Sequence, residues 1–146
     1  MNFITKTFSE LTISELYKIL QLRSEVFVVE QDCVYQDLDF KDQKALHIFG
    51  KKKEAIIAYT RVFKSGDYFE KASIGRVVIS NSERKSGLGH DIMKASIASI
   101  KIHFNEAEIT ISAQKYLKKF YETHNFIQIG VEYLEDGIPH IRMDRN

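Results

Sequence analysis

The sequence predicts an α/β (α+β) domain built on a mixed, mostly antiparallel central sheet flanked by helices. Three observations predict this class. An amphipathic helix pattern at residues 88–104 lies between strand patterns at 72–79 and 108–112, the order of a strand–helix–strand unit with parallel strands. Two strand patterns within 47–63 flank a short polar turn. Two more, within 126–143, surround Glu135-Asp136-Gly137, so both pairs should form antiparallel hairpins.

The N-terminal elements are a short strand at residues 3–7 and a helix at residues 14–28. Ile13, Leu16 and Leu20 recur at near-helical spacing. Either Thr12 or Ser14 can cap this helix, because its hydroxyl can accept a hydrogen bond from a free backbone amide. After an acidic loop, strands at 47–50 and 55–63 form the first hairpin, and the strand at 72–79 extends it to an antiparallel meander.

The later elements follow from the same kinds of pattern. The helix at residues 88–104 has one apolar face, which consists of Leu88, Ile92, Met93, Ile97, Ile100 and Phe104. A strand at 108–112 and a helix at 116–124 come next, and a hairpin of strands at 126–133 and 140–143 ends the chain. No repeat or Pro/Gly/Ser-rich linker interrupts this order, so residues 1–146 are predicted to form a single domain.

Composition limits the classes of function. With 44% apolar residues and a formal net charge of +1, the chain should fold as a globular domain and should not bind nucleic acid through many phosphate contacts. The first residues lack a continuous apolar core and no apolar run could span a membrane, so we expect a soluble, cytoplasmic protein. Cys33 is the only cysteine, which excludes an internal disulfide and makes a packing role more plausible than nucleophilic catalysis.

The most informative segment is residues 84–89 (RKSGLG), between the buried strand pattern and the long helix pattern. The first N–H groups of such a helix have no intrahelical partners, and the helix dipole adds partial positive charge there. Gly87 and Gly89 have no Cβ atom to block a ligand from the backbone, and Arg84 and Lys85 add positive charge. The segment therefore predicts an anion site suited to phosphate.

Other readings of this segment fit less well. A P-loop requires lysine after its second glycine, whereas Gly89 is followed by His90 and Asp91. A dinucleotide fingerprint requires a third small residue, and Ile92 at that position would hold the helix and strand apart. A solvated turn with glycines that only reverse the chain is the simplest alternative. The strand before the turn and the helix after it favour an anion site instead.

In this context the spacing R-x-x-G-x-G resembles the acyl-CoA motif of the GNAT superfamily of N-acyltransferases, whose turn binds the pyrophosphate of coenzyme A. Residues 114–126 (QKYLKKFYETHNF) resemble the helix and strand that close the cofactor cleft in that family. Residues 23–36 (RSEVFVVEQDCVYQ) and 137–141 (GIPHI) resemble its ElaA-like branch. The likeness covers nearly the whole chain and implies a GNAT-like sheet whose two parallel strands splay apart around the pantetheine arm.

The resemblance implies acetyl-CoA as the acyl donor and no metal. The implied cofactor-binding residues belong to the earlier parallel strand and the glycine turn: Val77, Val78, Ile79, Arg84, Lys85, Ser86, Gly87, Leu88, Gly89 and His90. Tyr121 matches the family's frequently catalytic tyrosine, and its phenol could protonate the departing thiolate. A tyrosine of the pocket wall is the plainer interpretation.

The general base is less clear. Many members of the family carry an acidic residue on the central strand, where this chain has Ser73 and Arg76. Glu30, after the first helix, and His47, at the start of the second strand, are the candidates, each acting through water. His140, beside the only proline, is a third option.

The predicted function is transfer of an acetyl group from acetyl-CoA to a primary amine, by direct attack in a ternary complex. Residues 30–42 have a local net charge of −4 and could attract a cationic amine, or could simply be solvated. A noncatalytic acyl-CoA-binding sensor or an interaction module is the alternative. The acceptor, a small molecule or a peptide, is not specified, and two chains could pair as a homodimer through exposed strand edges, as relatives often do.

Overall fold

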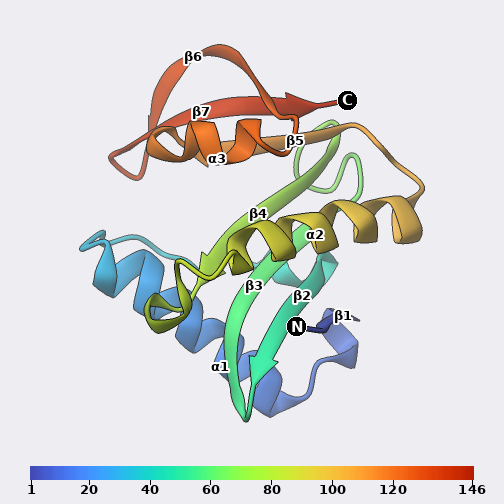
Figure 1. The fold of residues 1–146 in the computed structure, drawn as a ribbon, viewed down its shortest axis with the longest axis vertical. Helices are drawn as coiled ribbons and strands as arrows, with labels where there is room; N and C mark the ends of the chain where they lie inside the picture. Colours follow the sequence, from blue (N-terminus) through green and yellow to red (C-terminus); the bar gives the residue numbers. More distant parts are fainter.

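The computed structural model describes residues 1–146 and contains one seven-stranded sheet with the order β1-β2-β3-β4-β5-β7-β6 (Figure 1). The strands are β1 (Phe3–Thr7), β2 (Leu46–Lys52), β3 (Ala55–Phe63), β4 (Ala72–Ile79), β5 (Ile109–Gln114), β6 (Ile127–Glu135) and β7 (Ile138–Arg145). The helices are α1 (Ile13–Arg23), α2 (Leu88–Phe104) and α3 (Lys118–Glu122). Only β4 and β5 pair in parallel, which confirms the predicted mixed, mostly antiparallel sheet.

The N-terminal helix begins at the predicted cap. The Thr12 hydroxyl accepts a hydrogen bond from the Glu15 amide at 3.0 Å, and the Glu15 carboxylate accepts one from the Thr12 amide at 2.9 Å. After α1 the chain continues as a π-helical segment, η2 (Ser24–Glu30), in which the Gln31 amide bonds to the Val26 carbonyl at 3.2 Å. The helix predicted at 14–28 is therefore α1 and η2 together.

Two cores stabilise the sheet, one on each face. Side chains of β3 alternate between them: Thr60 bonds to Ser96 of α2 at 2.6 Å, whereas Tyr59 packs with Ile19 and Leu22 of α1. The larger core lies under α2, which crosses β2, β3 and β4 (Figure 1). Both faces of the central strands are therefore covered, which explains why β3 is buried along nearly its whole length.

The parallel strands β4 and β5 pair only at their beginnings. Ala72 lies opposite Ile109 and Ser73 opposite Thr110, and no further pair follows. β5 continues its ladder with β7 instead, through to Gln114. The two strands therefore separate toward their carboxyl ends, which confirms the predicted splayed parallel pair.

Several element boundaries differ from the prediction by one or more residues. The helix expected at 116–124 is a short 3₁₀ segment, η5 (Lys115–Leu117), followed by α3. Asn125 then takes a left-handed φ of 69°, which asparagine tolerates well. β7 extends past Met143 because Asp144 accepts a hydrogen bond from the Thr110 hydroxyl at 2.7 Å, so the polar end of the strand stays in the ladder.

Candidate active site

A cavity of about 460 Å³ lies where β4 and β5 separate. β4 and β5 form two of its walls, and η2, α3 and the β6–β7 turn complete it. A volume in this range can hold a small ligand or the arm of a larger one. The predicted site residues that line it are Glu30, Val77, Val78, Ile79, Arg84, Gly89 and Tyr121. Those that do not are His47, Lys85, Ser86, Gly87, Leu88 and His90.

The glycine turn leads directly into α2. Lys85 and Gly87 both have left-handed backbones, with φ of 71° and 82°, so the chain reverses within a few residues. The Ser86 hydroxyl donates to the Glu83 carbonyl at 2.9 Å and holds the turn together. The amide of Asp91 bonds back to the Gly87 carbonyl at 3.2 Å. The amides that begin α2 before that bond have no helical acceptor and are available to an anion.

β4 presents an unpaired backbone edge to the cavity. Its antiparallel partner β3 pairs with one edge as far as Ile79, and β5 has left the other edge after Ser73. The Val78 side chain is buried in the smaller core, while Val77 and Ile79 are half-buried. Backbone N–H and C=O groups on this edge can therefore pair with an extended ligand that carries amide groups.

Arg84 and Glu30 form an ion pair at the edge of the cavity. Arg84 Nη1 lies 2.6 Å from Glu30 Oε2, and Arg84 Nε donates to the Ile79 carbonyl at 3.1 Å. Both side chains are about one-third exposed, at 36% and 34%. The guanidinium predicted to meet phosphate and the carboxylate predicted to act as base are therefore partners in this structure.

Tyr121 lines the cavity from α3 and is only 6% exposed. Its ring packs edge-on against Phe120 and Phe126, with centroids 5.1 and 6.1 Å away. Burial raises the pKa of its phenol well above the ordinary value. The hydroxyl therefore remains protonated at neutral pH, the form that can donate a proton or a hydrogen bond.

His47 does not reach the cavity. Its side chain is fully buried, with Nε2 2.9 Å from the Asp42 carbonyl and Nδ1 2.6 Å from the Tyr59 hydroxyl. Because a carbonyl only accepts, Nε2 carries the proton and Nδ1 accepts from Tyr59. Burial lowers the pKa of His47 and keeps the imidazole neutral. His47 is therefore not placed to act as the general base through water, because both of its ring nitrogens are bonded inside the fold and its side chain does not line the cavity.

The buried state of His47 should make stability depend on pH. Below about pH 6.5 His47 of the unfolded chain binds a proton that His47 of the folded chain does not bind. The contribution of His47 to stability is therefore fully present above this pH and is lost as the pH falls toward the pKa of the folded state. The free energy of unfolding should fall by up to about 1.4 kcal/mol per pH unit. Urea unfolding between about pH 7.5 and 5.5 measures this slope.

Two variants test this assignment. In His47→Gln the slope should become smaller, although the variant is less stable because two buried hydrogen bonds change. His103→Gln alters an exposed histidine of α2, and the slope of its unfolding free energy against pH should match the slope of the unmodified chain. Equal slopes in all three proteins would show that His47 is not responsible.

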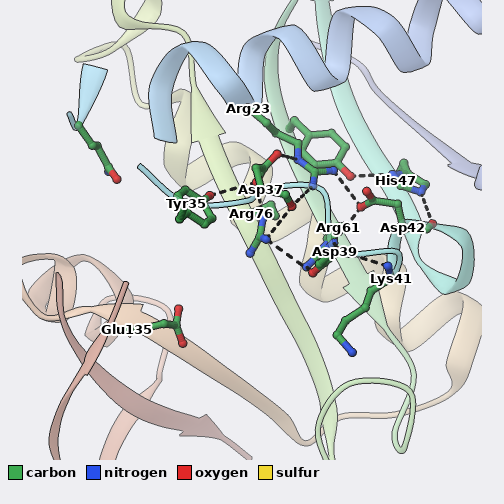
Figure 2. Close-up of polar contacts among 12 residues, drawn as sticks. Arg23, Tyr35, Asp37, Asp39, Lys41, Asp42, His47, Arg61, Arg76 and Glu135 are labelled. Carbon is green, nitrogen blue, oxygen red and sulfur yellow. Dashed lines mark hydrogen bonds and ion pairs between the residues drawn. The ribbon is translucent and has the colours of Figure 1, made fainter. Parts of the chain in front are cut away.

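Six charged side chains form an arginine–aspartate cluster on the α1 face of the sheet (Figure 2): Arg23, Asp37, Asp39, Asp42, Arg61 and Arg76. Arg23, fully buried, donates to Asp37 and Asp42, each at 2.8 Å. Arg61 bonds to both oxygens of Asp39, at 2.9 and 2.6 Å, and to Asp42 at 2.8 Å. Burial opposes ionisation of Asp42, but the two guanidinium groups hold its pKa below the usual range.

The cluster corrects the interpretation of the acidic loop. Of the carboxylates in residues 30–42, Asp37, Asp39 and Asp42 neutralise buried arginines, and Glu30 pairs with Arg84. The loop is therefore not a free acidic surface for a cationic substrate. Sequence patterns do not reveal this cluster, because the three arginines lie on different elements and far apart in the chain.

Arg76 connects the cluster to the cavity. It lies at a register shift between β3 and β4, with a left-handed φ of 50° that is costly for a residue with a Cβ atom. Its Nε donates to Asp37 Oδ1 at 2.7 Å and its Nη2 to the Asp37 carbonyl at 3.0 Å. Arg76 also lines the cavity, so the cluster fixes the part of β4 that faces the ligand.

His90, predicted to contact the cofactor, forms a pair with His124. Their Nδ1 and Nε2 atoms are 2.9 Å apart, and both rings pack near Phe120. Burial, with a smaller effect from His90, lowers the pKa of His124. The pair connects the first turn of α2 with the end of α3, so it positions the glycine turn relative to the cavity wall.

The wall opposite β4 contains polar residues that the sequence did not single out as catalytic. Glu135 and Ser112 line it together with His140, the third option considered for the base. The sequence pattern identifies Glu135 only as a turn residue between the last two strands. Glu135 lines the cavity because β4 and β5 separate, and no local sequence pattern predicts that separation.

The structure contains no group of three or more His, Cys, Asp or Glu side chains placed to hold a metal ion. None of its helices combines the length and apolar character needed to cross a lipid bilayer.

Comparisons with known proteins agree with this geometry. The family model for the acetyltransferase (GNAT) domain matches residues 5–146. Protein ElaA of Escherichia coli is 42% identical over 139 residues, covering 94% of this chain and 91% of that protein. The crystal structure of E. coli ElaA matches with a TM-score of 0.93 at 38% identity over 100% of both chains. An acyl-CoA N-acyltransferase from Pseudomonas aeruginosa matches with a TM-score of 0.92 at 37% identity over 99% of both chains. The chain therefore belongs to the GNAT acetyltransferase family.

Proposed function

We propose that this protein transfers the acetyl group of acetyl-CoA to a primary amine by direct attack in a ternary complex. The observation that carries the proposal is the cavity between the separated strands, which has an unpaired edge of β4 on one side and reaches Gly89 of α2. The description of the Pseudomonas aeruginosa relative as an acyl-CoA N-acyltransferase supports it.

The donor would occupy three parts of the site. The amides that begin α2, with Lys85 nearby, suit the diphosphate of coenzyme A, because an anion there meets free N–H groups and the positive end of the helix dipole. The unpaired edge of β4 suits the amides of the pantetheine arm. A backbone N–H of Val78 or Ile79 would polarise the thioester carbonyl and stabilise the oxyanion that forms.

The transfer requires one bond to form and one to break. The neutral amine attacks the thioester carbonyl carbon, a C–N bond forms, and the C–S bond of the tetrahedral intermediate then breaks. The leaving thiolate takes a proton from the Tyr121 hydroxyl, which regains one from water in the cavity. The amine nitrogen gives one proton to water as the C–N bond forms, which balances the proton that Tyr121 recovers from water, so the products are an N-acetyl amide and free coenzyme A.

Two measurements test the proposal. Isothermal titration of the protein with acetyl-CoA and with coenzyme A should detect binding to both. Release of free thiol should then be followed with acetyl-CoA and a panel of peptides, polyamines, amino sugars and arylamines. Binding without turnover on any amine would favour an acyl-CoA sensor, and the absence of binding would overturn the proposal.

Gly89→Ala should weaken acetyl-CoA binding by about tenfold or more without destabilising the fold. An added Cβ would meet Phe120 at 3.5 Å, an ordinary contact, and alanine favours the helix by up to about 1 kcal/mol over glycine. The methyl group would, however, face a ligand close to the backbone. Calorimetry gives the affinity and thermal unfolding the stability. Unchanged affinity would show that the cofactor does not approach this turn.

A further inference from the structure

Four side chains on the wall opposite β4 form one hydrogen-bonded chain. The Ser112 hydroxyl donates to Glu135 Oε1 at 3.1 Å, because a carboxylate only accepts. That bond uses the single proton of Ser112, so Tyr133 is the donor in its short contact with Ser112. On the other side of the carboxylate, His140 Nε2 lies 3.3 Å from Glu135 Oε2. Glu135 is therefore held from both sides.

The proton on the His140 ring can be assigned from its partners. Nδ1 lies 2.7 Å from the Ile138 carbonyl, which can only accept, so Nδ1 carries a proton. The lone pair of a neutral His140 ring then points from Nε2 toward Glu135, and one further proton can lie between the two groups. His140 is buried, with 8% of its side chain exposed, whereas 47% of Glu135 is exposed. Glu135 is therefore the member that a substrate meets.

The charges around the cavity leave Glu135 without a basic partner other than His140. Arg84 is paired with Glu30, and Arg76 is held by Asp37. Figure 2 shows Glu135 apart from the arginine–aspartate cluster, across from Arg76 and Tyr35. The exposed Glu135 carboxylate therefore gives this end of the cavity negative charge that favours a cation.

We infer that Glu135 is the proton acceptor of the transfer, with His140 as its positioning residue, and that the acceptor substrate is an alkylammonium ion. This inference rests on the proposed function. An aliphatic amine has a pKa near 10.4, so at neutral pH it arrives protonated and cannot attack. Its ammonium binds the Glu135 carboxylate, one N–H bond breaks, and the proton is taken up by Glu135 and passed to His140 Nε2.

The resulting state is chemically balanced. The substrate becomes a neutral amine with a free electron pair, and the pair of Glu135 and His140 becomes a carboxylate beside an imidazolium. The Ile138 carbonyl and Ser112 keep their hydrogen bonds throughout. Because Glu135 lies on the wall facing β4, the released electron pair is directed across the cavity toward a thioester held along that strand. The proton returns to water before the next turnover.

The test compares Glu135→Gln with Glu132→Gln, using acetyl-CoA and two acceptors, a linear alkyldiamine and an arylamine. Glu132 is a matched control, since it lies on the same strand, loses the same charge and pairs at the surface with Lys115 at 3.0 Å. With the diamine, Glu135→Gln should lower kcat/KM by about 10²–10⁴-fold. With the arylamine, which is already neutral, the loss should stay below about tenfold. His140→Gln should also lower kcat/KM more for the diamine than for the arylamine.

The outcomes separate this inference from the proposed function. If Glu135 or His140 had a merely structural role, its substitution would lower kcat/KM equally for the diamine and the arylamine. That result would overturn the inference. Behaviour of Glu135→Gln like that of Glu132→Gln would also overturn it, while turnover by the unmodified chain would leave the proposed function standing. If the unmodified chain binds acetyl-CoA but acetylates neither these two amines nor any other amine of the panel described above, both the inference and the proposed function fail. Calorimetry on each variant checks that acetyl-CoA affinity is unchanged.

Discussion

Arg23→Met should lower the free energy of unfolding by about 3–5 kcal/mol, the range found when one partner of a buried ion pair is removed. Arg23 has no solvent exposure and donates to both Asp37 and Asp42. The arginine–aspartate cluster balances three positive charges with three negative ones, so methionine would leave a buried excess of negative charge. Arg61 and Arg76 already bond to Asp42 and Asp37, so the two carboxylates would keep one arginine each and lose the bonds that Arg23 donates.

Urea unfolding at neutral pH measures this loss. The control is Lys18→Met, which removes a positive charge from an exposed contact with Glu54 at 4.0 Å and should change stability by less than about 0.5 kcal/mol. Arg23→Lys should recover little, because an ammonium group cannot reproduce the planar fork that reaches two carboxylates. A loss below about 1 kcal/mol in Arg23→Met would show that the cluster contributes little to folding.

The cluster also matters for the site, because it fixes the wall of the cavity formed by β4. The left-handed backbone of Arg76 belongs to the irregular part of β4, and the side chain of the same residue is held by Asp37. Asp37 in turn is bonded to Arg23 of α1. The separation of β4 from β5 and the path of the loop after η2 are therefore coupled through one set of ion pairs.

Local patterns were sufficient to predict most of the fold. The helix at 88–104 matches α2 in both of its ends, because its apolar face and the glycines before it are contiguous in sequence. The glycine turn was found for the same reason. The strand ends were predicted less accurately, because polar residues such as Asp144 remain in the sheet when a partner strand supplies the hydrogen bonds.

The polar groups of the site could not be predicted in this way, because their partners are distant in sequence. His47 opens a strand as expected, but its burial depends on Tyr59 of the next strand. Glu135 and Ser112 are 23 residues apart, and they come together because β5 and β6 both pair with β7 in one sheet. Alternation along a strand indicates which residues share a face, yet it does not indicate which charges from other elements will meet them.

Tyr121→Phe should lower kcat by about 100-fold, equivalent to about 2.7 kcal/mol of transition-state stabilisation, while the affinity for acetyl-CoA stays within about twofold. The aromatic ring packs against Phe120 and Phe126, and phenylalanine preserves those contacts. The hydroxyl serves the departing sulfur, which acquires its charge only as the C–S bond breaks. Loss of an interaction made only in the transition state lowers kcat and kcat/KM together.

Steady-state thiol release and calorimetry on the same preparation measure both quantities. Tyr17→Phe is the matched control, because Tyr17 is 75% exposed on α1 and does not line the cavity. Since burial raises the pKa of Tyr121, its hydroxyl should stay protonated to at least about pH 10, and ionisation of this group should not reduce turnover below that value. A Tyr121→Phe variant with unchanged kcat would assign Tyr121 to the pocket wall, and protonation of the thiolate would then fall to water.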